Sequence, residues 1–225
     1  MARGASTSQL AFDHVQIAVS DLDDAAARFH ADHGLRSLAG GHHPGRGTAN
    51  RIIPLGDSYL ELITITDVAE AANQPTSLRV ARALAERAFM PVWIVRTDDL
   101  GRERERLLRL GLALPPLAAG SRQKPDGTWL EWRMQELVAE AIPSPLPFLI
   151  EWLAPPENHP GWLPEADPQR NVRFQSLVLS HPDPAPARRL LSTVLRGHAC
   201  WSVVEGEPGV RELVMAAPGR VIRLG

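Results

Sequence analysis

The sequence predicts an α+β protein built from a repeated strand–helix–strand–strand–strand unit. The main observation is an echo along the chain: residues 14–35 read as an alternating apolar strand that runs into an amphipathic helix, and 92–112 repeat the pattern. A weaker third copy covers 174–197, and each copy is followed by further short strand-like segments. Any α+β protein offers some strand–helix echoes, but here the echo extends through five elements in the same order.

The predicted helices have recognisable starts and stops. Small polar residues that accept hydrogen bonds from the first helical N–H groups precede each one, and a glycine follows each one. The starts are Ser20 with Asp23, Thr97 with Asp98, and Asp183 with Pro184. The stops are Gly34, Gly111 and Gly197. Two connections also stand out: residues 76–88 are expected to form an extra helix, and 155–171 form a proline-rich linker.

Composition excludes several classes of protein. The chain has 225 residues, of which 44% are hydrophobic, with a formal net charge of −2 and a pI near 6.4. This balance gives no electrostatic reason to expect nucleic acid or an anionic membrane as a partner. A single cysteine, Cys200, excludes an internal disulfide. The N-terminus has no apolar core of a signal peptide, so we expect a cytoplasmic protein.

Several stretches resemble the glyoxalase-like domain family of the vicinal oxygen chelate superfamily. They are FDHVQIAVSDLDDA, GGHHPGRGTANRIIPLGDSYLELI, RTDDL, SRQKPDGT and PFLIEW, all within residues 11–154. The resemblance implies that two βαβββ modules pair into a curved eight-stranded cup. We therefore expect one domain of paired modules over 10–154 and a third, degenerate module over 172–225.

The resemblance also implies a metal centre, because members of the superfamily hold a divalent ion with side chains from the first and last strand of each module. Carried onto this chain, the ligand positions are His14, Glu61, Glu151 and Val92. The first three suit Zn²⁺, Mn²⁺, Ni²⁺ or Fe²⁺ and leave coordination positions open. Valine binds no metal, so Val92 indicates either an open catalytic site or a centre that has lost its ion.

Each proposed ligand also has an ordinary structural explanation. A lone histidine on a strand is more often a hydrogen-bonded structural residue than a ligand. Strand alternation places Glu61 and Glu151 opposite their apolar neighbours, on a face that would be solvent in an ordinary sheet. Inside a cup, buried carboxylates require a cation, an arginine partner or a raised pKa.

Other polar or aromatic side chains are expected to face the cup and to contact a substrate, although packing at the core or rim would explain them equally well. These candidates are Gln16, His43, Asn50, Tyr59, Arg96 and Trp132.

These features predict a metal-dependent isomerase, lyase or epimerase acting on a small substrate with two adjacent oxygens, with Glu61 or Glu151 as general base. The alternative is a metal-free small-molecule binding or resistance protein of the same fold. The apolar positions of the third module predict a homodimer that buries them. The rival arrangement is that this module folds back on its own chain and covers the cup as a wall.

Overall fold

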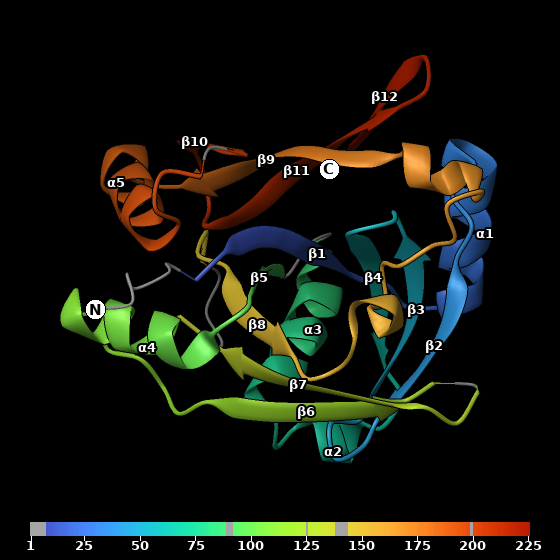
Figure 1. Ribbon diagram of the computed structural model, residues 1–225, viewed down its shortest axis with the longest axis horizontal. Helices are drawn as coiled ribbons and strands as arrows, with labels where there is room; N and C mark the ends of the chain where they lie inside the picture. The colour runs from blue at the N-terminus through green and yellow to red at the C-terminus, as the bar shows by residue number, and fades with distance from the viewer. Residues whose placement is uncertain (1–7, 89–91, 125, 138–143, 199) are drawn as a thin grey trace, which may run out of the picture.

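The computed structural model describes residues 8–88, 92–124, 126–137, 144–198 and 200–225 (Figure 1). Most of the N-terminal segment considered for a signal peptide therefore lies outside the described residues. The larger sheet contains β1 (Leu10–Ala18), β2 (Leu38–His43), β3 (Thr48–Pro54), β4 (Tyr59–Ile65), β5 (Val92–Thr97), β6 (Ala118–Gln123), β7 (Trp129–Gln135) and β8 (Phe148–Trp152). The smaller sheet contains β9 (Arg173–His181), β10 (Trp201–Glu205), β11 (Gly209–Ala217) and β12 (Arg220–Leu224). The helices are α1 (Leu22–His33), α2 (Val68–Ala71), α3 (Pro75–Glu86), α4 (Leu100–Arg109) and α5 (Pro184–Val194).

The larger sheet has the strand order β2-β3-β4-β1-β5-β8-β7-β6 and curves into the predicted eight-stranded cup. Its two halves meet at the antiparallel pair β1–β5, and each half has its first strand parallel to its fourth. The edge strands β2 and β6 come together on the far side. Arg122 Nη1 donates to Gly40 O at 2.6 Å across this seam, and Arg46 Nη2 donates to Ala119 O at 2.9 Å.

Local signals explain where the helices begin and end. The Asp21 side chain caps α1 by accepting from the backbone N–H groups of residues 23 and 24, and Asp99 caps α4 in the same way. The predicted starts at these two helices were therefore one residue too early. Gly34 ends α1 with φ +68°, a conformation that costs glycine little. The helix predicted over 76–88 is α3.

A β-bulge interrupts the central strand β1. Phe12 and His14 pair with successive residues of β5, and Asp13 between them has no partner in that register. The extra residue shifts the alternation, so that Phe12 faces the smaller sheet and His14, two residues later, faces the cavity. Asp13 and His14 can then direct their side chains to the same region. Beyond the bulge, Val15 and Ile17 are fully buried in the core outside the cup.

The C-terminal sheet has the predicted order of elements along the chain, namely strand, helix and three strands. Its spatial order is β10-β9-β11-β12, so the first strand lies inside the sheet beside the second and third. In both halves of the cup the first strand pairs with the fourth instead. The prediction of a third copy of the module is therefore not confirmed, because a shared sequence order of elements does not fix how the strands pair.

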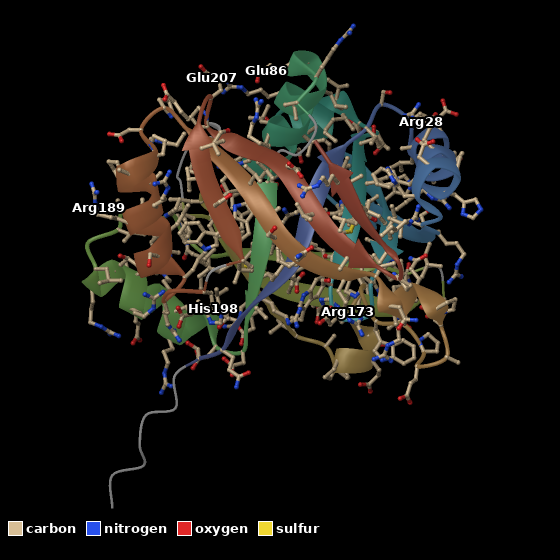
Figure 2. All side chains as sticks on the ribbon, turned by 90° about the horizontal axis from the view of Figure 1, so that it is seen from above. Arg28, Glu86, Arg173, Arg189, His198 and Glu207 are labelled. Carbon is tan, nitrogen blue, oxygen red and sulfur yellow. The ribbon has the colours of Figure 1, made fainter. Side chains whose placement is uncertain are left out.

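The smaller sheet packs on the face of the cup opposite the cavity. Figure 1 shows it above β1, and Figure 2 shows its strands crossing over β1 and β5. The rings of Phe12 and Phe174 stack with centroids 3.6 Å apart, and Leu177 and Met215 share one core with Ile17. The apolar face is thus buried against its own chain, as the rival arrangement predicted, but it covers the outside of the cup and does not wall the cavity. The homodimer stays a prediction.

Residues 155–171 pass along one end of the first half. They contain two short 3₁₀ helices, Pro156–Asn158 and Pro168–Asn171. Gly56 N donates to Gly161 O at 2.7 Å, and Gln169 Nε2 donates to Pro54 O at 2.7 Å. Within the described ranges, no helix has the length and apolar character needed to cross a membrane.

Candidate functional site

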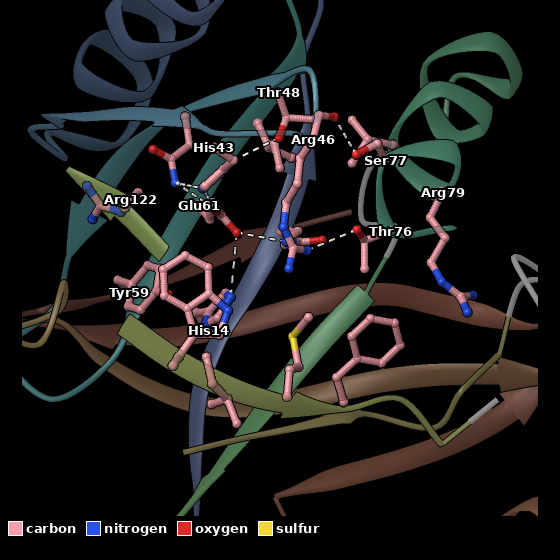
Figure 3. A pocket seen from close by; sticks show the side chains of 18 of the residues that line it. His14, His43, Arg46, Thr48, Tyr59, Glu61, Thr76, Ser77, Arg79 and Arg122 are labelled. Atoms are coloured by element: carbon pink, nitrogen blue, oxygen red, sulfur yellow. Dashed lines mark hydrogen bonds and ion pairs between the residues drawn. The ribbon is translucent and has the colours of Figure 1, made fainter. Parts of the chain in front are cut away.

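The inner face of the cup lines a cavity (Figure 3). The first half of the sheet contributes mainly polar side chains, which are His14, Gln16, His43, Thr48, Asn50, Tyr59 and Glu61. The second half contributes mainly apolar ones, which are Trp132, Met134, Phe148, Ile150 and Trp152. Helix α3 borders the cavity with Thr76, Ser77, Arg79 and Val80.

A chain of buried ionisable groups crosses β1. The fully buried carboxylate of Asp13 contacts His14 Nδ1 through Oδ1 at 2.6 Å. On the other side of the ring, His14 Nε2 lies 3.5 Å from Glu61 Oε2. The second oxygen of Asp13 contacts His159 Nε2 at 3.0 Å and accepts from Trp152 Nε1 at 3.1 Å. The bulge makes this chain possible, because it allows neighbouring residues of one strand to interact.

Glu61 is held as a carboxylate inside the cavity. Gln16 Nε2 donates to its Oε2 at 2.8 Å, and Asn50 Nδ2 donates to its Oε1 at 2.5 Å. Burial by itself would raise the pKa of Glu61, but the interactions with His14, His43 and Asn50 outweigh it and lower this pKa to about 2. Glu61 is therefore an ionised hydrogen-bond acceptor near neutral pH.

The surroundings shift the pKa values of the two histidines of the cavity in opposite directions. Burial favours the neutral form of His14, yet the carboxylates of Asp13 and Glu61 raise its pKa above the usual 6.5. Burial lowers the pKa of His43 to about 4, so that ring is neutral near pH 7. Tyr59 stacks on His14 with ring centroids 4.2 Å apart, and burial raises the pKa of its phenol well above 10.

A family model described as a glyoxalase-like domain matches residues 12–195. The chain belongs to the glyoxalase-like domain family. The match continues beyond the cup through β9 and α5, so it is longer than the stretch from 11 to 154 on which the sequence resemblance rests.

The solved structure with the higher TM-score supports the fold of this glyoxalase-like protein. The chain resembles a hypothetical protein from Staphylococcus aureus with a TM-score of 0.75 and 13% identity, over 96% of this chain and 98% of that one. Methylmalonyl-CoA epimerase from Streptomyces coelicolor, in complex with 2-nitronate-propionyl-CoA, is 18% identical with a TM-score of 0.44, over 64% and 97% of the two chains. The Mycobacterium tuberculosis epimerase is 20% identical with a TM-score of 0.43, over 64% and 88%. None of the curated proteins compared matches this chain.

The capping residues show how the two halves of the glyoxalase-like cup correspond. Asp21 caps the helix after β1, and Asp99 caps the helix after β5. His14 lies seven residues before Asp21, and Val92 lies seven residues before Asp99. Val92 is therefore the counterpart of His14, as the family resemblance implied. Both side chains border the cup, and Val92 belongs to an apolar cluster there.

The same correspondence shows that the last ligand position was misassigned. Gln16 pairs with Glu61 across β1 and β4, and its counterpart Ile94 pairs with Phe148 across β5 and β8. The counterpart of Glu61 is therefore Phe148, three residues before Glu151. Strand alternation then directs Glu151 away from the cavity.

Glu151 forms an ion pair with Arg133 on the outer face of β7 and β8. The prediction that it converges with His14 and Glu61, as a metal ligand or as a general base, is wrong. The described residues contain no group of three or more histidine, cysteine, aspartate or glutamate side chains placed to hold a metal ion. Of the predicted ligands only His14 and Glu61 remain together, fewer than the three protein ligands typical of a catalytic zinc site. The predicted ligand set therefore does not fit the implied metal.

Arg96 also lies elsewhere than predicted. Its Nη1 donates to Phe12 O at 2.9 Å and to Asp57 O at 2.6 Å. It borders a separate outer cleft, together with His159 and Trp162, and not the cavity of the cup. The structure does place Gln16, His43, Asn50, Tyr59 and Trp132 in the cavity as predicted.

Three functional residues were missed by the sequence reasoning. Asp13 was not among the candidates, because strict alternation would place it on the face opposite His14 and takes no account of a bulge. Arg122 borders the cavity because it pairs with Leu130 across β6 and β7, a register that the sequence leaves open. Arg46 follows the two histidines of β2 and reaches the cavity from a loop, where no periodicity applies.

Proposed function

We propose that this protein binds a small amphipathic molecule in the cup without a resident metal ion. The observation that supports the proposal is the division of the cavity into a polar half and an apolar half. The polar half offers fixed hydrogen-bonding groups. In the apolar half, the side chains of Met134, Phe148 and Ile150 offer no hydrogen-bonding group. A molecule with a polar end and a hydrocarbon body matches both.

The polar end would meet one acceptor and one donor held in fixed positions. Glu61 is ionised, and Asn50 and Gln16 hold its two oxygens in place. His14 is anchored through Nδ1 by Asp13, which leaves Nε2 on the side of the cavity. Hydrogen bonds to charged groups are stronger than neutral ones, and fixed partners lose little entropy on binding.

The hydrocarbon body would lie against the second half. The buried apolar cluster there contains Val92, Ile94, Leu130, Trp132, Met134, Phe148 and Ile150. Each methylene group that moves from water onto such a surface stabilises the complex by about 0.8 kcal/mol. This corresponds to roughly a fourfold gain in affinity per methylene group.

A series of neutral amides tests this proposal. Acetamide, propionamide, butyramide and hexanamide share one polar head and differ only in the length of the chain. We expect affinity, measured by ligand-observed NMR, to rise by up to about fourfold per methylene until the cavity is full. Absence of binding, or affinities that do not depend on chain length, would contradict the proposal.

The two glutamates provide a matched pair of variants for the same assay. Glu61→Gln removes the charged acceptor inside the cavity and should weaken butyramide binding by about tenfold, in line with the loss of a hydrogen bond to a charged group. Glu151→Gln makes the same chemical change on the outer face and should leave binding unchanged. Equal effects of the two substitutions would show that binding does not use the cavity.

A metal-free isomerase is a second candidate, favoured by the contact between Asp13 and His14. A carboxylate that orients an imidazole is a common arrangement for proton transfer. Glu61 suits a base less well than the sequence suggested, because its lowered pKa makes it a weak one. Hydroxyacetone and dihydroxyacetone, which carry adjacent oxygens, should then exchange carbon-bound hydrogen in D₂O faster with the wild type than with His14→Gln. Equal rates would count against this candidate.

Three further expectations belong to the proposal. They are a cytoplasmic location, a homodimer, and a division into a domain over 10–154 and a unit over 172–225. Light scattering checks the dimer, which would have twice the chain mass of 24.6 kDa. Limited proteolysis checks the division, which predicts early cleavage within 155–171.

A further inference from the structure

Two arginine side chains border the cavity without a carboxylate partner. Arg122 is only 4% exposed, and its one hydrogen bond within the described ranges is from Nη1 to Gly40 O. Arg46 is partly buried and donates to Thr76 Oγ1 at 3.1 Å and to Ala119 O at 2.9 Å. For neither does the described part of the chain supply a carboxylate within ion-pair distance.

The carboxylates inside the cup are engaged by other groups. Asp13 contacts two histidines and a tryptophan, and Glu61 accepts from Gln16 and Asn50 and faces His14. Glu61 influences Arg122 and Arg46 only through longer-range charge interaction. The two guanidinium groups thus remain without a close counter-charge.

A buried guanidinium without a counter-charge is costly, because it leaves water and receives only weak compensation from a backbone carbonyl. Burial accordingly lowers the pKa of Arg122. An anion in the cavity would supply the missing compensation, and the planar guanidinium fork suits carboxylate and phosphate oxygens.

We propose that the ligand of this cavity carries an anionic oxygen group, a carboxylate or a phosphate, which docks on Arg122 and Arg46. This inference rests on the proposed binding function of the same cavity and adds a charge to the ligand.

The guanidinium of Arg122 lies at the seam where the apolar half meets β2 of the polar half. Arg122 comes from β6, the edge strand of the second half. In the same β6–β7 pair, Trp132 lies opposite Gly120. A Cβ atom at Gly120 would lie 2.4 Å from the Trp132 ring, so the absence of a side chain there allows the indole to pack against β6. Figure 3 shows Arg122 on the side of His43 and Tyr59, and Arg46 reaching in from the other side.

Butyrate and butyramide test the inference, because they have nearly the same shape and differ in charge. We expect butyrate to bind the wild-type protein at least about tenfold more tightly at pH 7, a difference of about 1.4 kcal/mol. Methyl phosphate is titrated in parallel to tell a carboxylate site from a phosphate site. The site prefers the anion whose affinity exceeds that of butyramide by the larger factor.

Arginine variants show where the preference arises. Arg122→Gln and Arg46→Gln should each reduce the preference for the anion, and the double variant should bring butyrate to parity with butyramide. Arg133→Gln is the control, because Arg133 pairs with Glu151 on the outer face. Circular dichroism and thermal unfolding confirm that each variant folds. If Arg122→Gln does not fold, the wild-type comparison and Arg46→Gln still decide the question.

The outcomes separate this inference from the proposed function. Equal affinity of the wild type for butyrate, methyl phosphate and butyramide would overturn the anionic ligand while leaving the binding function intact. A preference for the anion that survives in the double variant would also overturn it. Failure of all three probes to bind would instead refute the binding function itself.

Discussion

The two halves of the cup share one architecture and differ in chemistry. Each contains a strand, a capped helix and three further strands, and each pairs its first strand with its fourth. At equivalent positions, however, the first half has His14, Gln16 and Glu61, and the second half has Val92, Ile94 and Phe148. The structure thus joins a network of polar side chains to a wall of apolar ones.

This difference indicates that the two halves of a repeated fold have different roles. Paired modules provide two equivalent sets of inward positions, and a metal centre of the superfamily type draws on both. Here one set keeps ionisable side chains and the other packs as a small core. The halves are therefore better suited to bind opposite ends of one molecule than to share one ion.

The largest effect is expected from placing a charge in the apolar half. Phe148→Glu puts a carboxylate at the counterpart of Glu61, where Phe148 is 5% exposed. The guanidinium of Arg79 lies 5.1 Å from the Phe148 ring centroid, but it is already paired with Glu136. We expect a loss of at least about 4 kcal/mol in the free energy of unfolding, or failure to fold.

The matched control is Trp129→Glu on the neighbouring strand, where the side chain is 54% exposed. It should cost less than about 1 kcal/mol in chemical denaturation. If Phe148→Glu costs as little as Trp129→Glu, the inner face of the second half is not the buried apolar cluster that this account requires.

The next largest effect is expected at Asp13, the buried carboxylate of the polar network. Asp13→Asn removes the buried charge that contacts both His14 and His159, so we expect a loss of about 3 kcal/mol in urea denaturation. Asp23→Asn provides the comparison, since Asp23 is mostly exposed and pairs with Arg51 at 2.8 Å on the surface. It should change stability by less than about 1 kcal/mol. Similar losses of stability in Asp13→Asn and Asp23→Asn would show that the polar network does not depend on the buried charge of Asp13.

The smallest effect concerns pH. The pKa of Glu61 falls from 4.5 to about 2 on folding, so its ionised form stabilises the protein above pH 4.5, and this contribution is lost as pH falls toward 2. It amounts to at most about 3 kcal/mol. The stability gap between the wild type and Glu61→Gln should therefore be largest at neutral pH and shrink below pH 4.5. A constant gap in denaturation curves from pH 3 to 7 would contradict this account.

Much of the cup could be predicted from the sequence, because periodicity, caps and the repeated order of elements all reflect local physics. Gln16, His43 and Asn50 were placed correctly for this reason. Glu151 was misplaced by three residues, and any odd shift in strand register moves a side chain to the other face. Only the pairing of Ile94 with Phe148 fixes that register. Asp13 required knowledge of a bulge, and the pairing within the smaller sheet depends on contacts distant in sequence.

The central claim is that the polar half of the cup works without a resident metal. Metal content of the wild-type protein, purified without chelator and measured by inductively coupled plasma mass spectrometry, tests it most directly. Samples of His14→Ala, Glu61→Gln and Glu151→Gln, prepared in parallel, are the comparison. The account predicts well under one divalent ion per chain in all four. One ion per wild-type chain that is lost with His14→Ala and Glu61→Gln, but kept with Glu151→Gln, would contradict it.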